Sequence, residues 1–222
     1  MPAAPDRTCL ATGHTGPVTN ETTAIPSTDG GAPAYLPMIR GERVFLRPAE
    51  KSDVQTFVRW FADAEMSGFL GMRAPMSEAM EEQWFTRAVE QQGKENYHFV
   101  MCRLDNSQPI GTISLFHLDQ TNGNAGVGIS IGEKELWGQG YGTDAMNALL
   151  DFGFGQLRLE RIWLEVYDYN DRARRSYEKS GFVVEGTQRH ANYRLGKYHD
   201  VLLMAILHDD WAGLIRKRSW DY

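Results

Sequence analysis

Three glycines alternate within residues 137–145, which read WGQGYGTDA. The preceding residues, 125–131, alternate as a strand does, and residues 146–152 carry apolar side chains at helical spacing. The glycines therefore lie at a turn from a strand into a helix. Glycine permits backbone conformations closed to other residues, and the first N–H groups of a helix have no partner within it. The stretch therefore predicts an anion-binding turn that favours phosphate.

The spacing of these glycines excludes two common phosphate-binding loops. A Walker loop needs Gly-Lys-Ser/Thr, whereas Gly142 stands directly before Thr143 and the turn has no lysine. The Rossmann pattern G-x-G-x-x-G is also absent, because the glycines follow G-x-G-x-G. We therefore expect a phosphate-containing ligand that is bound by neither loop.

The chain has 222 residues, which suits one domain and a tail. Residues 1–37 hold most of the nine prolines, and their few apolar residues show no period, so we expect a flexible N-terminal tail there. The domain is expected over residues 38–208. Residues 209–222 are expected to form a short C-terminal appendage, which is basic at residues 216–218.

Charge and cysteine content narrow the classes of partner and compartment. The formal net charge of −6 argues against nucleic acid and anionic membranes as partners. No apolar run approaches the roughly 20 residues needed to span a bilayer, and no signal-peptide pattern opens the chain. Cys9 and Cys102 lie far apart, so a disulfide framework is not expected. These features predict a cytoplasmic protein.

The remaining patterns predict the order strand, two helices, three strands, helix, strand, helix and two strands. Ser52 and Asp53 are expected to cap the first helix and Ser77 the second. A polar loop is expected over residues 186–200, between the last two strands. This order predicts an α/β fold of three layers, in which helices flank a mixed, mostly antiparallel central sheet.

Two linked motifs resemble those of the GNAT N-acetyltransferase superfamily. The glycine turn resembles the family's pyrophosphate loop, Arg/Gln-x-x-Gly-x-Gly/Ala, with Gly140 and Gly142 at its small positions and Trp137 where Arg or Gln is usual. Residues 170–182, NDRARRSYEKSGF, are similar to the family's Asn-x-x-Ala/Ser-x-x-x-Tyr-x-Lys-x-Gly-Phe. The Trp-Gly-x-Gly-Tyr variant resembles the branch of the ribosomal-protein N-terminal acetyltransferases.

The resemblance implies an enzyme that moves an acetyl group from acetyl-CoA to a primary amine by direct attack, without a metal. It also implies that the strand end before the loop pairs with the pantetheine arm as an added strand does. Arg172, Arg174 and Lys179 lie on the second motif's helix, and any of them could meet the 3′-phosphate; Arg174 is the one selected as cofactor-binding. The implied cofactor-binding residues are Ile129, Ser130, Ile131, Trp137, Gly138, Gln139, Gly140, Tyr141, Gly142, Thr143, Asn170, Ala173, Arg174 and Tyr177.

Tyr177 follows Ala173 by four residues and shares its helix face. An amine that takes an acyl group from a thioester expels a thiolate, and a phenol near the sulfur can protonate it. The resemblance gives Tyr177 this role of general acid. Asn170 either caps the helix or binds an amide of the ligand.

The general base is not given by the motifs. Many relatives have a glutamate in the strand before the glycine loop, whereas residues 124–130 have glycine or serine at the alternate positions. Glu165 is the selected candidate, because it shares its strand face with Trp163 and Tyr167. The alternatives are His117, Glu185 and Asp200.

The acceptor is left open between a basic peptide N-terminus and a small polyamine-like amine. Residues 52–92, which are expected to contact the acceptor, carry more acidic residues than arginines, so an acidic rim is expected to attract a cation. Trp60, Phe69, Trp84 and Tyr193 could wall the slot, although core packing is favoured for the two tryptophans. Two other classes remain: a catalytically silent acyl-CoA-binding module and a different nucleotide binder. A homodimer is one option for assembly.

Overall fold

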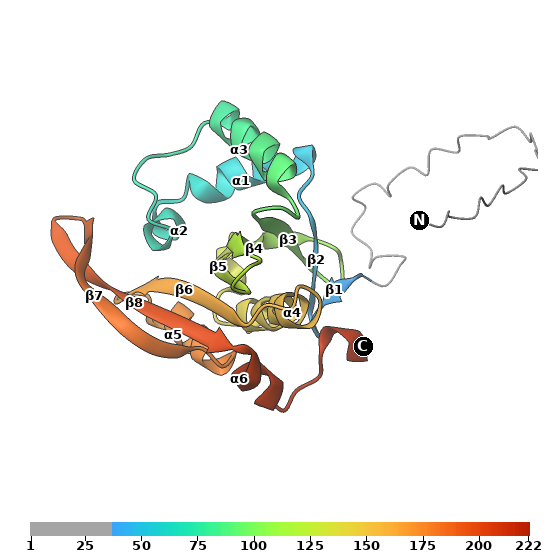
Figure 1. Ribbon diagram of the computed structural model, residues 1–222. Helices are drawn as coiled ribbons and strands as arrows, with labels where there is room; N and C mark the ends of the chain where they lie inside the picture. The colour runs from blue at the N-terminus through green and yellow to red at the C-terminus, as the bar shows by residue number, and fades with distance from the viewer. Residues whose placement is uncertain (1–36) are drawn as a thin grey trace, which may run out of the picture.

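The computed structural model describes residues 37–222, so the predicted tail lies outside the described residues except for Pro37. Eight strands form one sheet in the order β1-β2-β3-β4-β5-β6-β8-β7 (Figure 1). Every neighbouring pair is antiparallel except β5 with β6, which confirms the prediction of a mixed, mostly antiparallel sheet. The strands are β1 (Ile39–Arg40), β2 (Val44–Pro48), β3 (Tyr97–Arg103), β4 (Pro109–Asp119), β5 (Asn124–Ile131), β6 (Arg161–Tyr167), β7 (Val183–Arg194) and β8 (Lys197–Leu207).

Helices cover both faces of the sheet (Figure 1). One face carries α1 (Val54–Phe61), α2 (Ala64–Phe69) and α3 (Glu78–Gln91). The other carries α4 (Tyr141–Gly155), α5 (Asp171–Lys179) and α6 (His208–Gly213). Short 3₁₀ turns occur at η1 (Lys51–Asp53), η2 (Lys134–Leu136) and η3 (Ser219–Asp221). Within residues 37–222, no helix is both long enough and apolar enough to cross a membrane.

Two apolar clusters hold these layers together. The larger one joins α4 to the sheet through fully buried residues such as Leu149 and Ile162, and Tyr177 of α5 packs against it. The smaller cluster lies under α1 and contains Phe57, Trp60 and the free thiol of Cys102. The sheet therefore has a packed face on each side, and the three-layer prediction is confirmed.

The two parallel strands separate soon after they begin. Asn124–Gly126 of β5 pairs with Arg161–Trp163 of β6, and no further pairing joins these strands. On its other side β5 stays paired with β4 as far as Ile131. The end of β5 therefore presents one edge of unpaired backbone N–H and C=O groups toward β6.

Two sequence predictions near α1 are wrong. A third helix, α2, follows α1, and Asp63 caps it by accepting hydrogen bonds from the N–H groups of Glu65 and Met66. Asp53 does not cap α1, because its buried carboxylate accepts from Arg47 at 2.7 Å and from the Glu50 N–H. The predicted cap at Ser77 is confirmed by a hydrogen bond from the Met80 N–H.

The predicted polar loop over residues 186–200 is also wrong. These residues extend β7 and β8 into a long hairpin that turns at Leu195 and Gly196, both with positive φ. Most side chains of the hairpin are exposed on both faces, so the alternating apolar pattern of a half-buried strand is missing. Arg194 near the tip donates to the Met72 carbonyl, and the hairpin therefore reaches the loop after α2 (Figure 1).

The C-terminal residues are anchored to α4 by a buried carboxylate. Asp151 is 1% exposed and accepts hydrogen bonds from Trp211 at 2.9 Å and from the Ser219 N–H at 2.8 Å. Arg216 pairs with the same carboxylate at 2.6 Å. Residues 209–222 thus pack on α4, while the predicted division at residue 208 stays a prediction.

We predict that Asp151→Asn destabilises the fold by roughly 2–4 kcal/mol. The guanidinium of Arg216 loses its counter-charge, while the isosteric asparagine leaves the surrounding packing unchanged. Urea unfolding measures the change. Asp209→Asn is the control, since the Asp209 side chain is 98% exposed and its loss should cost less than about 1 kcal/mol. Equal effects of the two substitutions would show that the buried pair does not stabilise this packing.

Candidate active site

A cavity of about 360 Å³ opens where β5 and β6 diverge. It is walled by the end of β5, the glycine turn, the end of β6, one face of α5, and α2. Most of the residues selected from the sequence meet here. They are Ile129, Ser130, Ile131, Trp137, Gly138, Gly140, Gly142, Thr143, Glu165, Asn170, Ala173 and Tyr177.

The glycine turn is built to leave backbone N–H groups open. Gly138 has φ 75° and Gly140 has φ 90°, which side chains rarely adopt. Gly140 is the N-cap of α4 and provides no capping side chain, so the first N–H groups of the helix stay available. A side-chain carbon added at Gly138 would meet nothing within 4 Å, so a ligand can approach the main chain there.

The turn is held in place from β2 and the β1–β2 turn. Asp144 accepts hydrogen bonds from three successive N–H groups, those of Glu42, Arg43 and Val44, at 2.9–3.0 Å. Arg43 donates to the Gln139 carbonyl, and its guanidinium lies 4.1 Å from the ring centre of Tyr141. Gln139 and Tyr141 are not among the residues that line the cavity, and their selection as cofactor-binding residues stays a prediction.

The second motif brings α5 against the turn. Asn170 caps α5 by accepting from the Ala173 N–H at 3.2 Å, and Ser176 shares a 2.8 Å hydrogen bond with Thr143 of α4. Tyr177 packs against Phe182, with ring centres 6.1 Å apart. Burial raises the pKa of Tyr177 to about 12, so its hydroxyl stays protonated at neutral pH.

The basic residues that line the cavity differ from the one selected. Arg174 does not line it, because it pairs with Asp171 at 3.2 Å and lies 3.8 Å from Glu178. Arg172, Arg175 and Lys179 line the cavity instead. Their spacing of three and four residues places them on one helix face, and that spacing could have revealed Arg175 from the sequence.

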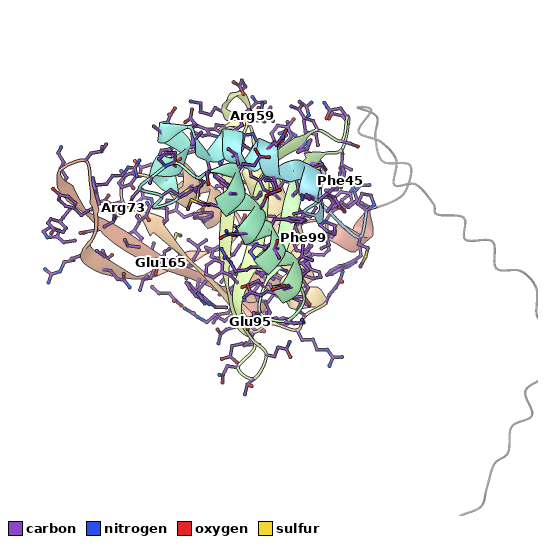
Figure 2. The ribbon with its side chains drawn as sticks, turned by 90° about the horizontal axis from the view of Figure 1, so that it is seen from above. Phe45, Arg59, Arg73, Glu95, Phe99 and Glu165 are labelled. Carbon is purple, nitrogen blue, oxygen red and sulfur yellow. The ribbon has the colours of Figure 1, made fainter. Side chains whose placement is uncertain are left out.

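Glu165 is the only carboxylate among the residues that line this cavity. It is exposed, and no hydrogen bond or ion pair engages it within residues 37–222. Figure 2 labels Glu165, which belongs to β6.

The three alternative bases are placed elsewhere. The Arg161 guanidinium holds the pKa of Glu185 below its usual range, and Asp200 accepts from the His190 N–H at 2.8 Å. His117 lies beside Asn96, whose side chain accepts from the His117 N–H at 3.2 Å. None of the three lines the cavity. The geometry therefore favours Glu165 among the candidates.

The end of the cavity near α2 is apolar and is held by the hairpin. Met66, Phe69 and Leu70 line it. The Tyr169 hydroxyl donates to the Gly68 carbonyl at 2.9 Å and accepts from Asn192 of β7. Arg73, labelled beside the hairpin in Figure 2, donates to the carbonyl of Tyr193.

The expected aromatic walls and acidic rim are only partly present. Phe69 lines the cavity, but Trp60 is 3% exposed within the core and Trp84 packs edge-on against Phe57. Tyr193 is half exposed on the hairpin and is not part of the lining.

Several acidic side chains of the expected rim are neutralised by ion pairs. Lys134 pairs with Asp63 at 2.7 Å and with Glu65 at 3.3 Å, and Arg47 pairs with Asp53. The rim is therefore less acidic than its composition suggests.

These features fit an acyl-CoA ligand. The turn offers free N–H groups and a cradle that an added side-chain carbon would enter, and three cations line the same cavity. Next to them, the unpaired edge of β5 can hydrogen-bond an amide-containing chain. Within residues 37–222, no group of three or more His, Cys, Asp or Glu side chains is placed to hold a metal ion.

Comparisons with known proteins agree with this geometry. The model of the acetyltransferase (GNAT) domain family matches residues 43–183. The uncharacterized N-acetyltransferase p20 of Bacillus licheniformis is 26% identical over 174 residues, which cover 78% of this chain and 97% of that protein. The putative ribosomal N-acetyltransferase YdaF of Bacillus subtilis is 36% identical over 103 residues, 46% of this chain and 56% of YdaF. The crystal structure of spermidine N-acetyltransferase from Vibrio cholerae in complex with CoA and spermine has a TM-score of 0.71 at 25% identity, covering 77% of this chain and 98% of that one.

We predict that Gly140→Val weakens acetyl-CoA binding at least tenfold, or about 1.4 kcal/mol, because a β-branched side chain cannot hold φ 90° beside the open N–H groups. Calorimetry on the folded variant measures the loss. Gly196→Val is the matched control: Gly196 also has positive φ, but it lies in the hairpin turn away from the cavity. An unchanged affinity for folded Gly140→Val would remove the turn from the binding site.

Proposed function

Because the chain belongs to the GNAT acetyltransferase family, we propose that it transfers an acetyl group from acetyl-CoA to a primary amine by direct attack, with Tyr177 as general acid and Glu165 as general base. The single observation that carries this proposal is that Tyr177 of α5 and Glu165 of β6 line one cavity at the β5–β6 opening. One residue can supply a proton there and the other can accept one.

Each wall of the cavity contributes a separate step. Acetyl-CoA, when bound, supplies an acetyl group activated as a thioester. The N–H groups after Gly140 and the cations of α5 would hold its phosphates, and the edge at Ile129–Ile131, which β6 does not pair with, would align its pantetheine arm. Tyr177 then holds a proton where the thiolate leaves, and its raised pKa keeps that proton in place until it is needed.

The amine needs a proton acceptor, because an ammonium ion has no lone pair with which to attack. Glu165 is exposed to the cavity and unpaired, so it can take this proton directly or through a water molecule. A catalytically silent acyl-CoA-binding module is the second candidate function. Neither residue would then need to line the cavity, so their joint placement favours the enzyme.

For the acceptor we propose an amine with net positive charge, either a basic peptide N-terminus or a small polyamine-like molecule. The support is the carboxylate of Glu165, which lines the same cavity as the apolar residues Met66, Phe69 and Leu70. Relatives named spermidine N(1)-acetyltransferase support a polyamine acceptor. One of them, from Vibrio cholerae, is 35% identical to this chain over 98 residues.

An acceptor screen tests this function. Purified protein and acetyl-CoA are incubated with spermidine, with basic peptides, and with the same peptides blocked at the N-terminus, and free thiol is measured. We predict that kcat/KM for the best acceptor falls as ionic strength rises from about 0.05 to about 0.5 M, since salt screens the attraction to Glu165. A best acceptor that is neutral or acidic, with no dependence on salt, contradicts the proposed charge.

We predict that Tyr177→Phe lowers kcat by roughly 10²–10⁴-fold while the Kd for acetyl-CoA changes little, because only the proton donor is lost. With a pKa of about 12, Tyr177 is protonated and active below that pH, so it should cause no alkaline loss of kcat up to about pH 10. Steady-state kinetics and calorimetry separate the two effects. A variant that keeps more than half of the wild-type kcat would show that another group is the acid.

We predict that Glu165→Gln lowers kcat/KM by roughly 10²–10⁴-fold near neutral pH. The deficit should shrink as the pH approaches the pKa of the acceptor amine, about 8 for a peptide N-terminus, because a neutral amine needs no base. Glu185→Gln is the control, since Glu185 lies outside the cavity and pairs with Arg161. A deficit that stays constant with pH would assign Glu165 to acceptor positioning instead.

A further inference from the structure

Arg172 lies in the first turn of α5 and covers the side chain of Trp137. Its guanidinium carbon is 3.8 Å from the ring centre of Trp137 and 5.4 Å from that of Phe69. It lines the cavity, and within residues 37–222 it has no hydrogen bond and no ion pair. Burial lowers the pKa of Arg172, which still leaves it charged at neutral pH. A charged guanidinium with all its N–H donors unused therefore faces the cavity.

The neighbouring Arg174 shows what an engaged arginine on the same helix looks like. Its charge is balanced by Asp171 and Glu178, one on each side along the helix. The carboxylate that acts to raise the pKa of Arg172 is that of Glu65, and Lys134 already pairs with it at 3.3 Å. Arg172 is therefore left with an aromatic support and without an anionic partner.

Trp137 stands where the loop pattern usually has Arg or Gln. Its indole N–H donates to the Ile131 carbonyl at 2.8 Å, so Trp137 has no donor left for a ligand. The guanidinium of Arg172 lies over its ring. Arg172 of α5 therefore places a positive charge next to residue 137, which carries no charge of its own in this chain.

Two contacts join α5 to the two sides of the turn. Thr143 and Ser176 share a hydrogen bond after the glycines, and Trp137 and Arg172 stack before them. The open N–H groups that follow Gly140 lie between these contacts in the chain. Arg172 lines the same cavity as Gly138 and Gly140, so a group bound by those N–H groups would share that cavity with its guanidinium.

We propose that Arg172, held over the ring of Trp137, binds the diphosphate of acetyl-CoA at the glycine turn and replaces the Arg or Gln usual at position 137. The proposal rests on the proposed acetyl-CoA site and adds a specific cofactor-positioning residue to it. A guanidinium forms paired, charge-assisted hydrogen bonds with phosphate oxygens, and stacking on an indole restricts its orientation beforehand.

Calorimetry with acetyl-CoA tests the proposal without any acceptor. Arg172→Gln keeps a planar, stackable group and removes the charge, and we expect it to weaken binding by about tenfold or more. Arg172→Lys, which keeps the charge without the forked donors, should lose less. Arg189→Gln is the control, because Arg189 is exposed on β7 outside the cavity lining, and it should stay within about twofold of wild type. Equal losses for Arg172→Gln and Arg189→Gln, or no loss for either, overturn the proposal.

Shortened ligands identify the phosphate group. If the diphosphate is the partner, Arg172→Gln weakens CoA and 3′-dephospho-CoA by the same factor. It then leaves kcat/KM for S-acetylpantetheine, which has no diphosphate, unchanged. A loss that disappears with 3′-dephospho-CoA assigns Arg172 to the 3′-phosphate and overturns the proposal. A loss confined to the KM of the acceptor does so as well, because it would place Arg172 in the wall formed with Phe69.

A variant that moves the guanidinium from α5 to the loop gives a further test, in which affinity should increase. Trp137→Arg in the Arg172→Gln background places a guanidinium on the loop itself and should recover part of the lost affinity. Folding of each variant is checked by thermal unfolding before binding is measured. A wild-type chain that binds acetyl-CoA but acetylates no amine contradicts the proposed function while the Arg172 test still decides. A wild-type chain that does not bind acetyl-CoA contradicts both.

Discussion

The separation of β5 from β6 is the constraint on which the site depends. Parallel pairing ends at Gly126 and Trp163, although both strands continue. Continued pairing would satisfy the backbone of both strands and leave no cavity between them. Because the pairing stops, one edge of β5 faces a cavity that a ligand can enter. Glu165 of β6 and Tyr177 of α5 line the same cavity. The opening is thus a property of the sheet and not of any single side chain.

A helix terminus binds an anion well only if the helix cannot move away, and α4 is fixed at both ends. Near its start, Asp144 accepts from the N–H groups that enter β2. Near its end, the buried Asp151 collects Trp211 and Arg216 from the C-terminal residues. The space between these anchors is filled by core residues such as Leu149. Residues 209–222, which were expected to form an appendage, therefore anchor α4 at Asp151.

Local patterns were sufficient where the chain determines its own conformation. The glycines at 138 and 140 require positive φ, and Asn170 begins α5 by capping it, as their positions in the sequence predict. Glu165 reaches the cavity because strand alternation sets its face. Arg174 pairs with acidic residues at helical spacing on both sides, and its selection stays a prediction. The same sequence pattern could have indicated this side-chain pairing along the helix.

The cavity wall near α2 could not be predicted in the same way, because it is assembled from segments that lie far apart in the sequence. Arg194 contacts the Met72 carbonyl, and Arg73 contacts Tyr193, so the hairpin and the loop after α2 define each other's position. The hairpin has no apolar alternation to reveal it, since water covers both of its faces. The pairing of Lys134 with Asp63 and Glu65 likewise removes charge that composition alone would count. The walls formed by the glycine turn and α5 therefore follow from two contiguous motifs. The wall near α2 follows from tertiary contacts between segments far apart in the chain, which neither motif specifies.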